Sequence, residues 1–199
     1  MSKEANASQP LIGRESTTVP GRFGEPLTVE HSVTSRGGFD QHAAHPLFLC
    51  LHGWGSSEED MADIMRLIAP YNDFMALRGP LTLAPAREGS LDPGNYAWFH
   101  DALPIGDDRD YDAYAATAVD RWVADNIPAD RDVVPLGFSQ GGLVAVHLLR
   151  INPERYRAVV SLSGFNTPGQ VPGTAPADSR LADYDIPVFY TYGKNDGVI

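Results

Sequence analysis

A serine in a predicted tight turn is the residue of this chain best suited to chemistry. The pentapeptide Gly137-Phe138-Ser139-Gln140-Gly141 fits the pattern G-x-S-x-G. An apolar run precedes it and an apolar helical pattern follows it, so strand, turn and helix succeed one another as a nucleophile elbow requires. The glycines let strand and helix pack closely, and the positive end of the helix points toward charge that forms near the serine. We predict that Ser139 is a nucleophile.

A serine hydroxyl is a weak nucleophile, so it needs a base, an acid that orients the base, and donors for the oxyanion. The tetrapeptide His52-Gly53-Trp54-Gly55 directly follows the apolar run 46–51, at the carboxyl end of an expected strand. Its glycines let backbone N–H groups turn toward the nucleophile. We expect the N–H groups of Trp54 and Gln140 to form an oxyanion hole. The alternative is that His52 and Gly53 only make a tight turn.

Asp196 follows the expected strand 187–192 and is the candidate acid, because Ser139 then precedes it as in the chain order Ser…Asp…His. An aspartate in this position can also simply close a turn. All six histidines precede Asp196, so the sequence shows no evident base. We expect His52 to hold the oxyanion loop by hydrogen bonds and His147, eight residues after Ser139 on the same helix, to point away from it. The six are His31, His42, His45, His52, His100 and His147.

Short apolar strands alternate with helical patterns, which predicts an α/β protein with a parallel sheet. Pro135 is unfavourable in a central strand because it lacks an N–H group, so we expect it where the hydrogen-bond ladder is interrupted. A long segment, 81–110, reads as an irregular functional loop. Strands are expected at 27–33 (a half-exposed edge strand), 46–51, 74–77, 133–136, 158–164 and 187–192, and helices at 58–68, 111–127 and after Gln140.

Composition limits the partners and the location. The 199 residues suit one domain, which we expect over 27–199 after a flexible arm at 1–26. The net charge of −11 disfavours nucleic acid and anionic membrane surfaces. The single cysteine, Cys50, lies in an apolar run and is expected to be buried and inert. No apolar run approaches a membrane span, and the polar start lacks a signal-peptide core, so we expect a cytoplasmic protein without a metal site.

Several short stretches together resemble the phospholipase/carboxylesterase family of α/β-hydrolases, which includes acyl-protein thioesterases and bacterial carboxylesterases. The resemblance extends from about Pro46 to the end of the sequence. It implies a mostly parallel central sheet with helices on both faces, Ser139 as nucleophile, and Asp196 as acid. It also implies Trp54 and Gln140 as oxyanion donors, and Trp98 and Phe99 near the acyl site, although core packing would explain these two aromatic residues nearly as well. The stretches are 51–55, 78–80, 97–99, 137–142, 162–164 and 192–199.

The sequence departs from the family in two places. Pro135 stands in the strand before the elbow, and the loop that carries the histidine and a final helix is lacking after Asp196. The expectation is therefore a C-terminally incomplete α/β-hydrolase domain. The expected function is that of a serine carboxylesterase or thioesterase acting on small esters through an acyl-enzyme, without cofactor, its histidine lying outside this sequence. If the chain truly ends at Ile199, the alternative is a non-catalytic binding protein on a hydrolase scaffold. A dienelactone-hydrolase-like enzyme would instead want cysteine at position 139.

Overall fold

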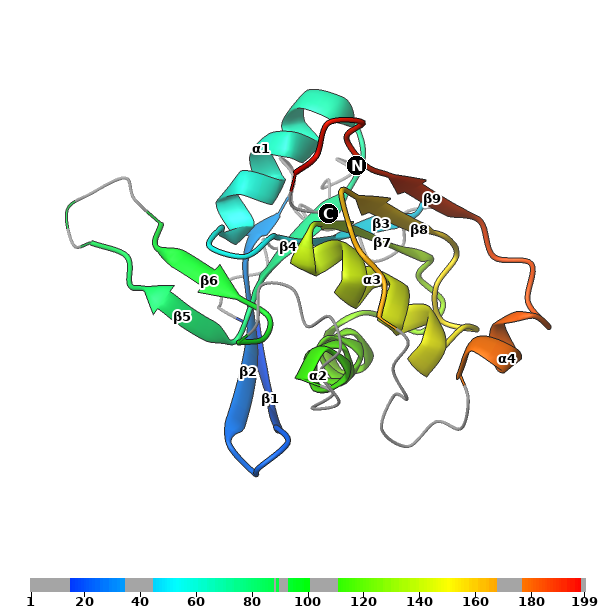
Figure 1. Ribbon diagram of the computed structural model, residues 1–199, viewed down its shortest axis with the longest axis horizontal. Coiled ribbons are helices and arrows are strands. Elements are labelled where there is room, and N and C mark those ends of the chain that lie inside the picture. The colour runs from blue at the N-terminus through cyan, green and yellow to red at the C-terminus, as the bar shows by residue number, and fades with distance from the viewer. Residues whose placement is uncertain are drawn as a thin grey trace, which may run out of the picture.

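The computed structural model describes residues 15–34, 45–87, 89, 93–100, 111–167 and 177–197. Its centre is a seven-stranded sheet with the order β1-β2-β4-β3-β7-β8-β9 (Figure 1). Neighbouring strands from β4 to β9 are parallel, whereas β1 pairs antiparallel with β2 and β2 antiparallel with β4. The strands of this sheet are β1 (Glu15–Pro20), β2 (Pro26–Thr34), β3 (Leu47–Leu51), β4 (Phe74–Arg78), β7 (Val133–Phe138), β8 (Val159–Leu162) and β9 (Val188–Thr191).

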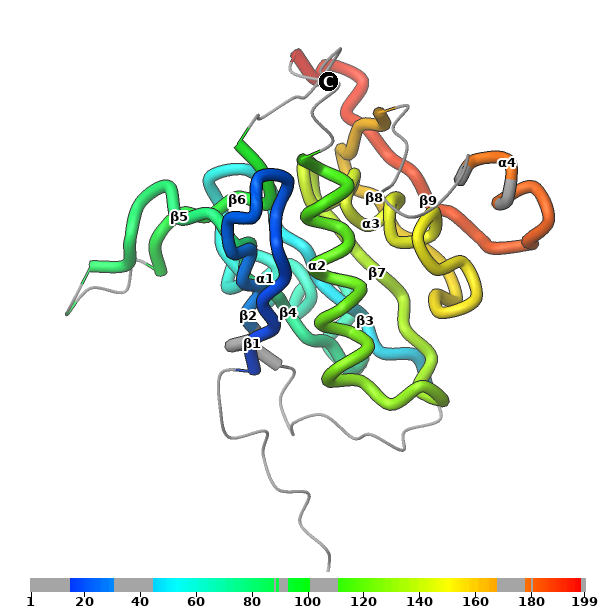
Figure 2. The backbone as a smooth tube through the Cα atoms, turned by 90° about the horizontal axis from the view of Figure 1, so that it is seen from below, coloured from blue at the N-terminus to red at the C-terminus, as the bar shows by residue number. Residues whose placement is uncertain are grey.

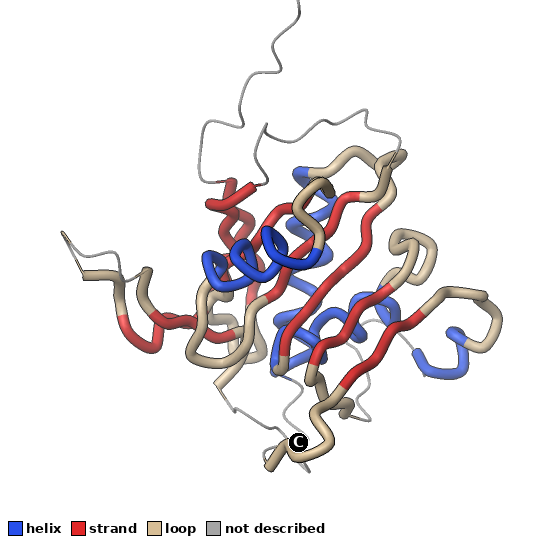
Figure 3. Tube along the Cα trace, turned by 90° about the horizontal axis from the view of Figure 1, so that it is seen from above, coloured by secondary structure: helices blue, strands red, loops and turns tan. Residues whose placement is uncertain are grey.

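Helices cover both faces of the sheet, as expected. Helix α1 (Glu58–Ile68) lies on one face, and α2 (Tyr111–Asn126) and α3 (Gln140–Ile151) lie on the other (Figures 2 and 3). In β3, Leu49 and Leu51 join the core on the side of α2 and α3, and Cys50 joins the core on the side of α1. Strands buried on both faces are nearly continuous apolar runs, which is why these central strands were recognisable in the sequence. A short helix, α4 (Ala177–Leu181), precedes β9.

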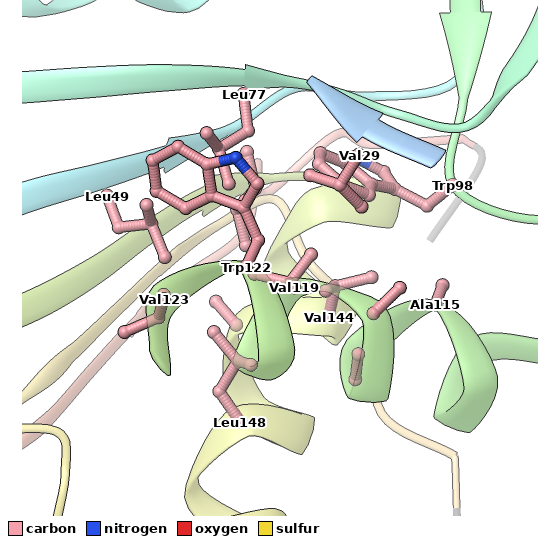
Figure 4. Packing of buried hydrophobic residues seen from close by; sticks show 14 of the residues in the cluster. Val29, Leu49, Leu77, Trp98, Ala115, Val119, Trp122, Val123, Val144 and Leu148 are labelled. Carbon is pink, nitrogen blue, oxygen red and sulfur yellow. The ribbon is translucent and has the colours of Figure 1, made fainter. Parts of the chain in front are cut away.

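The larger core is built on an aromatic side chain from α2. Trp122 is fully buried, and its ring lies between α2 and the sheet residues Leu49 and Leu77 (Figure 4). The Trp122 indole N–H donates to the carbonyl of Glu15 at 3.1 Å. This contact ties α2 to the first strand of the sheet.

The N-terminal part of the sheet differs from the sequence interpretation. The sequence predicts a flexible arm over 1–26, which is wrong for 15–20, because β1 pairs with β2 along its whole length. Consequently β2 is an inner strand between β1 and β4, not an edge strand. The sequence of β1 is mostly polar because this strand lies at the sheet edge, so apolar alternation did not reveal it. Residues 1–14 lie outside the described part of the chain.

Pro135 does occupy the central strand β7, opposite Leu49 of β3. On the β8 side, the Val133 carbonyl accepts from the backbone N–H of Arg157, and the Ser139 N–H donates to the Leu162 carbonyl, both at 2.9 Å. Every second residue of a strand directs its backbone N and C=O groups to the same side, so the nitrogen of Pro135 also faces β8. Regular pairing with β8 starts only at Leu136, so the expected interruption of the ladder is confirmed.

The segment 81–110 was expected to lack regular structure, which was wrong for its described beginning. Strands β5 (Leu81–Ala84) and β6 (Asn95–Ala97) form a separate two-stranded antiparallel sheet, which projects from the left side of the molecule in Figure 1. Residues 101–110 lie outside the described part. At the other end of the main sheet, β9 has exposed apolar side chains, and no helix follows it among the residues described up to 197.

Candidate active site

Ser139 occupies the junction between β7 and α3 in a strained backbone conformation, with φ 51° and ψ −114°. A Cβ atom on Gly137 would lie 2.0 Å from the Gly141 carbonyl oxygen, and one on Gly141 would lie 2.2 Å from that of Leu51. Both distances are far below van der Waals contact, so only glycine fits at either position. A non-glycine residue at positive φ costs about 1–3 kcal/mol and is retained when the surrounding structure imposes it, often at functional sites. The strand–turn–helix arrangement predicted for this stretch is confirmed.

The loop after β3 lies directly against the serine. Leu51 pairs with Gly137, so β3 and β7 end side by side at the same edge of the sheet. A Cβ atom on Gly53 would lie 3.1 Å from the Phe138 ring and 3.4 Å from the Ser139 Cβ. Further along, the Gly55 N–H donates to the Tyr96 carbonyl at 2.9 Å, which attaches the loop to β6. The structure thus brings residues 53–55 and the elbow together.

His52 holds this loop from inside the protein, as predicted. Its Nε2 accepts the Gly79 N–H at 3.0 Å, so the proton of the neutral ring lies on Nδ1, which donates to the Gly53 carbonyl at 2.8 Å. Burial lowers the pKa of His52 below its usual 6.5, more than the hydrogen bond to Gly53 and the nearby carboxylates of Glu58 and Asp60 raise it. The ring is therefore neutral and has both nitrogens engaged.

The Gln140 side chain was not predicted to have a role of its own. It is fully buried, its Oε1 accepts the Trp98 N–H at 2.8 Å, and its Nε2 donates to the Phe99 carbonyl at 3.0 Å. The Trp98 indole N–H in turn donates to the His52 carbonyl at 2.8 Å. These contacts span 41 to 46 residues in sequence, and no spacing pattern marks them.

Trp98 and Phe99 are only 1% and 2% exposed, so their side chains belong to the core. They also line a largely apolar recess of about 370 Å³, part of it open to solvent, together with Leu81 and Tyr111. Other lining residues are Glu25, Pro26, Leu27, His100 and Tyr114. That Trp98 and Phe99 contact an acyl group remains a prediction.

Strands β7, β8 and β9 are parallel neighbours, so Ser139, Ser163 and Asp196 all follow carboxyl ends at one edge of the sheet. Asp196 is half-buried, and its N–H donates to the Gly193 carbonyl at 3.0 Å in the turn after β9. Ser163 has φ 45° and is, with Ser139, one of two non-glycine residues at positive φ in the described part of the chain. The stretch 162–164 is part of the family resemblance, but no role for Ser163 followed from the sequence.

The histidines with described side chains do not supply a base to Ser139. His147 is buried in an ionic cluster between α2 and α3, which we define as Asp112, His147, Arg150 and Thr167. Its Nε2 contacts Asp112 at 2.9 Å and its Nδ1 accepts from Arg150 at 2.9 Å. His52 is engaged as described, His45 lies beside Asp73, and His100 is exposed beside Tyr111. The side chain of His31 and the whole of His42 lie outside the description.

Among the described residues, no group of three or more histidine, cysteine, aspartate or glutamate side chains is arranged to hold a metal ion. Cys50 is fully buried, and burial raises the pKa of its thiol, as expected for an inert cysteine. None of the described helices combines the length and the apolar character needed to cross a bilayer.

Sequence comparisons with known proteins bear on the family of this chain. Residues 39–199 match the family described as Phospholipase/Carboxylesterase. An acyl-protein thioesterase 1 of Cryptococcus neoformans is 28% identical over 174 residues, which cover 80% of this chain and 69% of that protein.

The structural comparisons concern the fold. A Bacillus cereus carboxylesterase superposes with a TM-score of 0.57 at 18% identity, covering 86% of this chain and 73% of that one. A Zea mays acyl-protein thioesterase 2 also has a TM-score of 0.57, at 20% identity, covering 81% and 76%. Together with the strand order, these likenesses confirm the predicted α/β-hydrolase fold.

Proposed function

The chain belongs to the phospholipase/carboxylesterase family, and from this premise we propose that it is a serine hydrolase of small carboxylic esters or thioesters. The observation that carries the proposal is the elbow. Ser139 lies at positive φ between β7 and α3, and the close backbone packing around it admits only glycine at positions 137 and 141. The adjacent loop places Gly53 against Ser139, and in this proposal the Trp54 N–H of that loop is an oxyanion donor.

In the first half of the reaction, the Ser139 Oγ attacks the carbonyl carbon of the ester or thioester while a base takes its proton. The carbonyl π electrons move to the oxygen, which becomes an oxyanion held by the N–H groups of Trp54 and Gln140. Collapse of this tetrahedral intermediate breaks the bond to the alcohol or thiol, which leaves with the proton. Water then attacks the acyl-enzyme by the same steps and releases the carboxylic acid.

The base in this proposal is a histidine from outside the described part of the chain, oriented by Asp196. Two features support this assignment. The rings of His52 and His147 are both engaged by hydrogen bonds on both nitrogens, so neither is available to Ser139. Asp196 follows β9 at the sheet edge where Ser139 follows β7, with β8 between these two strands.

The test is hydrolysis of a short-chain chromogenic ester by the full-length protein and by Ser139→Ala. We expect the variant to lose activity by a factor of about 10⁴ or more, because the nucleophile is gone while binding and the oxyanion donors remain. Equal rates would exclude the serine mechanism. A fluorophosphonate probe, which exchanges its fluoride for an activated serine oxygen, provides an independent readout. If the probe does not label the unmodified protein, the result would favour the alternative of a non-catalytic binding protein.

A further inference from the structure

Two backbone N–H groups of the proposed oxyanion hole come from separate segments. Trp54 lies in the loop after β3, and Gln140 begins helix α3. Both N–H groups have to lie about 2.7–3.1 Å from one oxygen atom, and a displacement of about 1 Å can cost a factor of 10² in rate. Whatever fixes these two segments relative to each other therefore contributes to catalysis.

The first segment is oriented through a single peptide unit. The Gly53 carbonyl, which accepts from His52 Nδ1 at 2.8 Å, belongs to the same planar peptide as the Trp54 N–H. In a trans peptide these two groups point in opposite directions, and the described chain contains no cis peptide. Holding the carbonyl against the buried His52 ring therefore turns the Trp54 N–H away from the ring. The opposite ring nitrogen is anchored on the Gly79 N–H at 3.0 Å.

The second segment is anchored by the side chain of the residue that also carries the donor. The Gln140 amide makes two hydrogen bonds to the 98–99 backbone, through Oε1 at 2.8 Å and Nε2 at 3.0 Å. A primary amide that bonds at both ends has one orientation, which fixes the start of α3.

Trp98 joins the two anchors. Its backbone N–H contacts the Gln140 side chain, and its indole N–H donates to the His52 carbonyl at 2.8 Å. The centroids of the His52 and Trp98 rings are 5.2 Å apart. All three side chains are at most 1% exposed, so water does not compete for these bonds. The connection runs from the Gly53–Trp54 peptide through Trp98 to the first residue of α3.

We propose that His52, Trp98 and Gln140 form a clamp, positioning residues that set the distance between the oxyanion donors of Trp54 and Gln140. This inference rests on the proposed function and assigns the three side chains a task in the transition state. It gives Trp98 a task beside its predicted place near the acyl site, through its backbone N–H and its indole N–H.

The test uses two buried tryptophans that make the same kind of bond. Trp98→Phe removes the indole N–H donated to the His52 carbonyl, and Trp122→Phe removes the one donated to the Glu15 carbonyl at the other end of the larger core. Both should lower the melting temperature to a similar extent. Only Trp98→Phe should lower kcat, by about tenfold, with KM changed by less than about twofold, because the lost interaction acts in the transition state.

A trifluoromethyl ketone sharpens the readout, because Ser139 adds to its carbonyl and leaves an oxyanion in the hole. Its Ki should rise in Trp98→Phe by about the factor lost in kcat, and should stay unchanged in Trp122→Phe. Equal kcat and equal Ki in the two variants would overturn the clamp. A Ser139→Ala variant that still hydrolyses ester at the unmodified rate would instead overturn the proposed function, so the two failures are distinguishable.

His52 provides a rescue experiment. An asparagine side chain can place its amide N–H where Nδ1 donates to the Gly53 carbonyl, whereas alanine cannot. We expect His52→Asn to retain about tenfold more kcat than His52→Ala. Equal kcat in two folded variants would show that the bond to Gly53 does not orient the donor.

Discussion

In the described part of the chain, two buried polar networks are each centred on a histidine, and they differ in charge. The clamp of His52, Trp98 and Gln140 contains neutral side chains that bond mainly to backbone groups. The ionic cluster contains a carboxylate and a guanidinium on either side of His147. Arg150 also donates to the Thr167 carbonyl, so the cluster ties α3 to the chain that follows β8.

The difference in charge fits the place of each network in the fold. A network of neutral groups fixes backbone segments without adding a charge beside the place where the oxyanion would form. The ionic cluster joins α2, α3 and residue 167, and its members on α3, His147 and Arg150, lie eight and eleven residues after Ser139. Burial raises the pKa of Asp112, but hydrogen bonds from His147 and Thr167 outweigh it and the net direction is down. We therefore expect the cluster to affect stability and the clamp to affect kcat.

The largest effect on stability should come from breaking the ionic cluster. Asp112→Ala removes the acceptor of His147 and of the Thr167 hydroxyl and takes the carboxylate out of the buried cluster. We expect the free energy of unfolding to fall by about 3–5 kcal/mol, while kcat of the folded enzyme changes little. Urea unfolding and ester hydrolysis measure the two quantities.

Asp178→Ala is the matched control, because Asp178 pairs with Arg150 of the same cluster, at 2.6 Å, but its side chain is 64% exposed. Its removal should cost less than about 1 kcal/mol. A similar loss of stability in both variants would contradict the role given to the buried cluster.

A smaller effect is expected from crowding the clamp at Gly79, whose N–H donates to His52. A Cβ atom on this residue would lie 2.5 Å from the Ala97 carbonyl oxygen. Gly79→Ala should therefore push β6 and His52 apart and lower the free energy of unfolding by about 1–3 kcal/mol. Unlike Asp112→Ala, it should also lower kcat. If kcat were unchanged in the folded variant, the clamp would tolerate displacement and the contrast between the networks would fail.

The neutral state of His52 predicts a pH dependence. Because burial lowers its pKa in the folded protein, the unfolded chain binds a proton at this residue below about pH 6.5 before the folded chain does. Its contribution to stability is complete above 6.5 and is lost as the pH falls, with a slope of up to about 1.4 kcal/mol per pH unit. Urea unfolding at pH values above and below 6.5 should show that the free energy of unfolding depends less steeply on pH in His52→Asn than in the unmodified protein. Identical slopes would mean that His52 accepts a proton without unfolding.

The smallest effect concerns Ser163, which starts the segment leading from β8 to Thr167. Its φ of 45° favours glycine over any residue with a Cβ. Ser163→Gly should be more stable than Ser163→Ala by about 1 kcal/mol, since both lack the hydroxyl and only alanine retains the strain. Chemical denaturation of the two variants measures this difference. A more stable alanine variant would indicate that the segment relaxes out of the left-handed region.

Local patterns in the sequence determined the centre of this molecule. The apolar runs of β3, β4 and β7 predict strands buried on both faces, and the glycines around Ser139 predict a turn with close backbone approach. His52 was correctly assigned to holding its loop, because a histidine next to a glycine loop at a strand end has backbone groups within reach. These features depend on residues that are neighbours in the chain, so periodicity and turn chemistry report them.

Tertiary structure alone decided the rest. The polar strand β1 forms because β2 offers it a ladder of hydrogen bonds, which no apolar alternation records. The Gln140 amide meets the backbone of Trp98 and Phe99 across 41 or 42 residues, and Ser163 adopts positive φ where β8 ends. Such contacts arise when the sheet aligns distant strand ends, and their energy lies in specific hydrogen bonds between segments instead of in a repeating pattern along one of them.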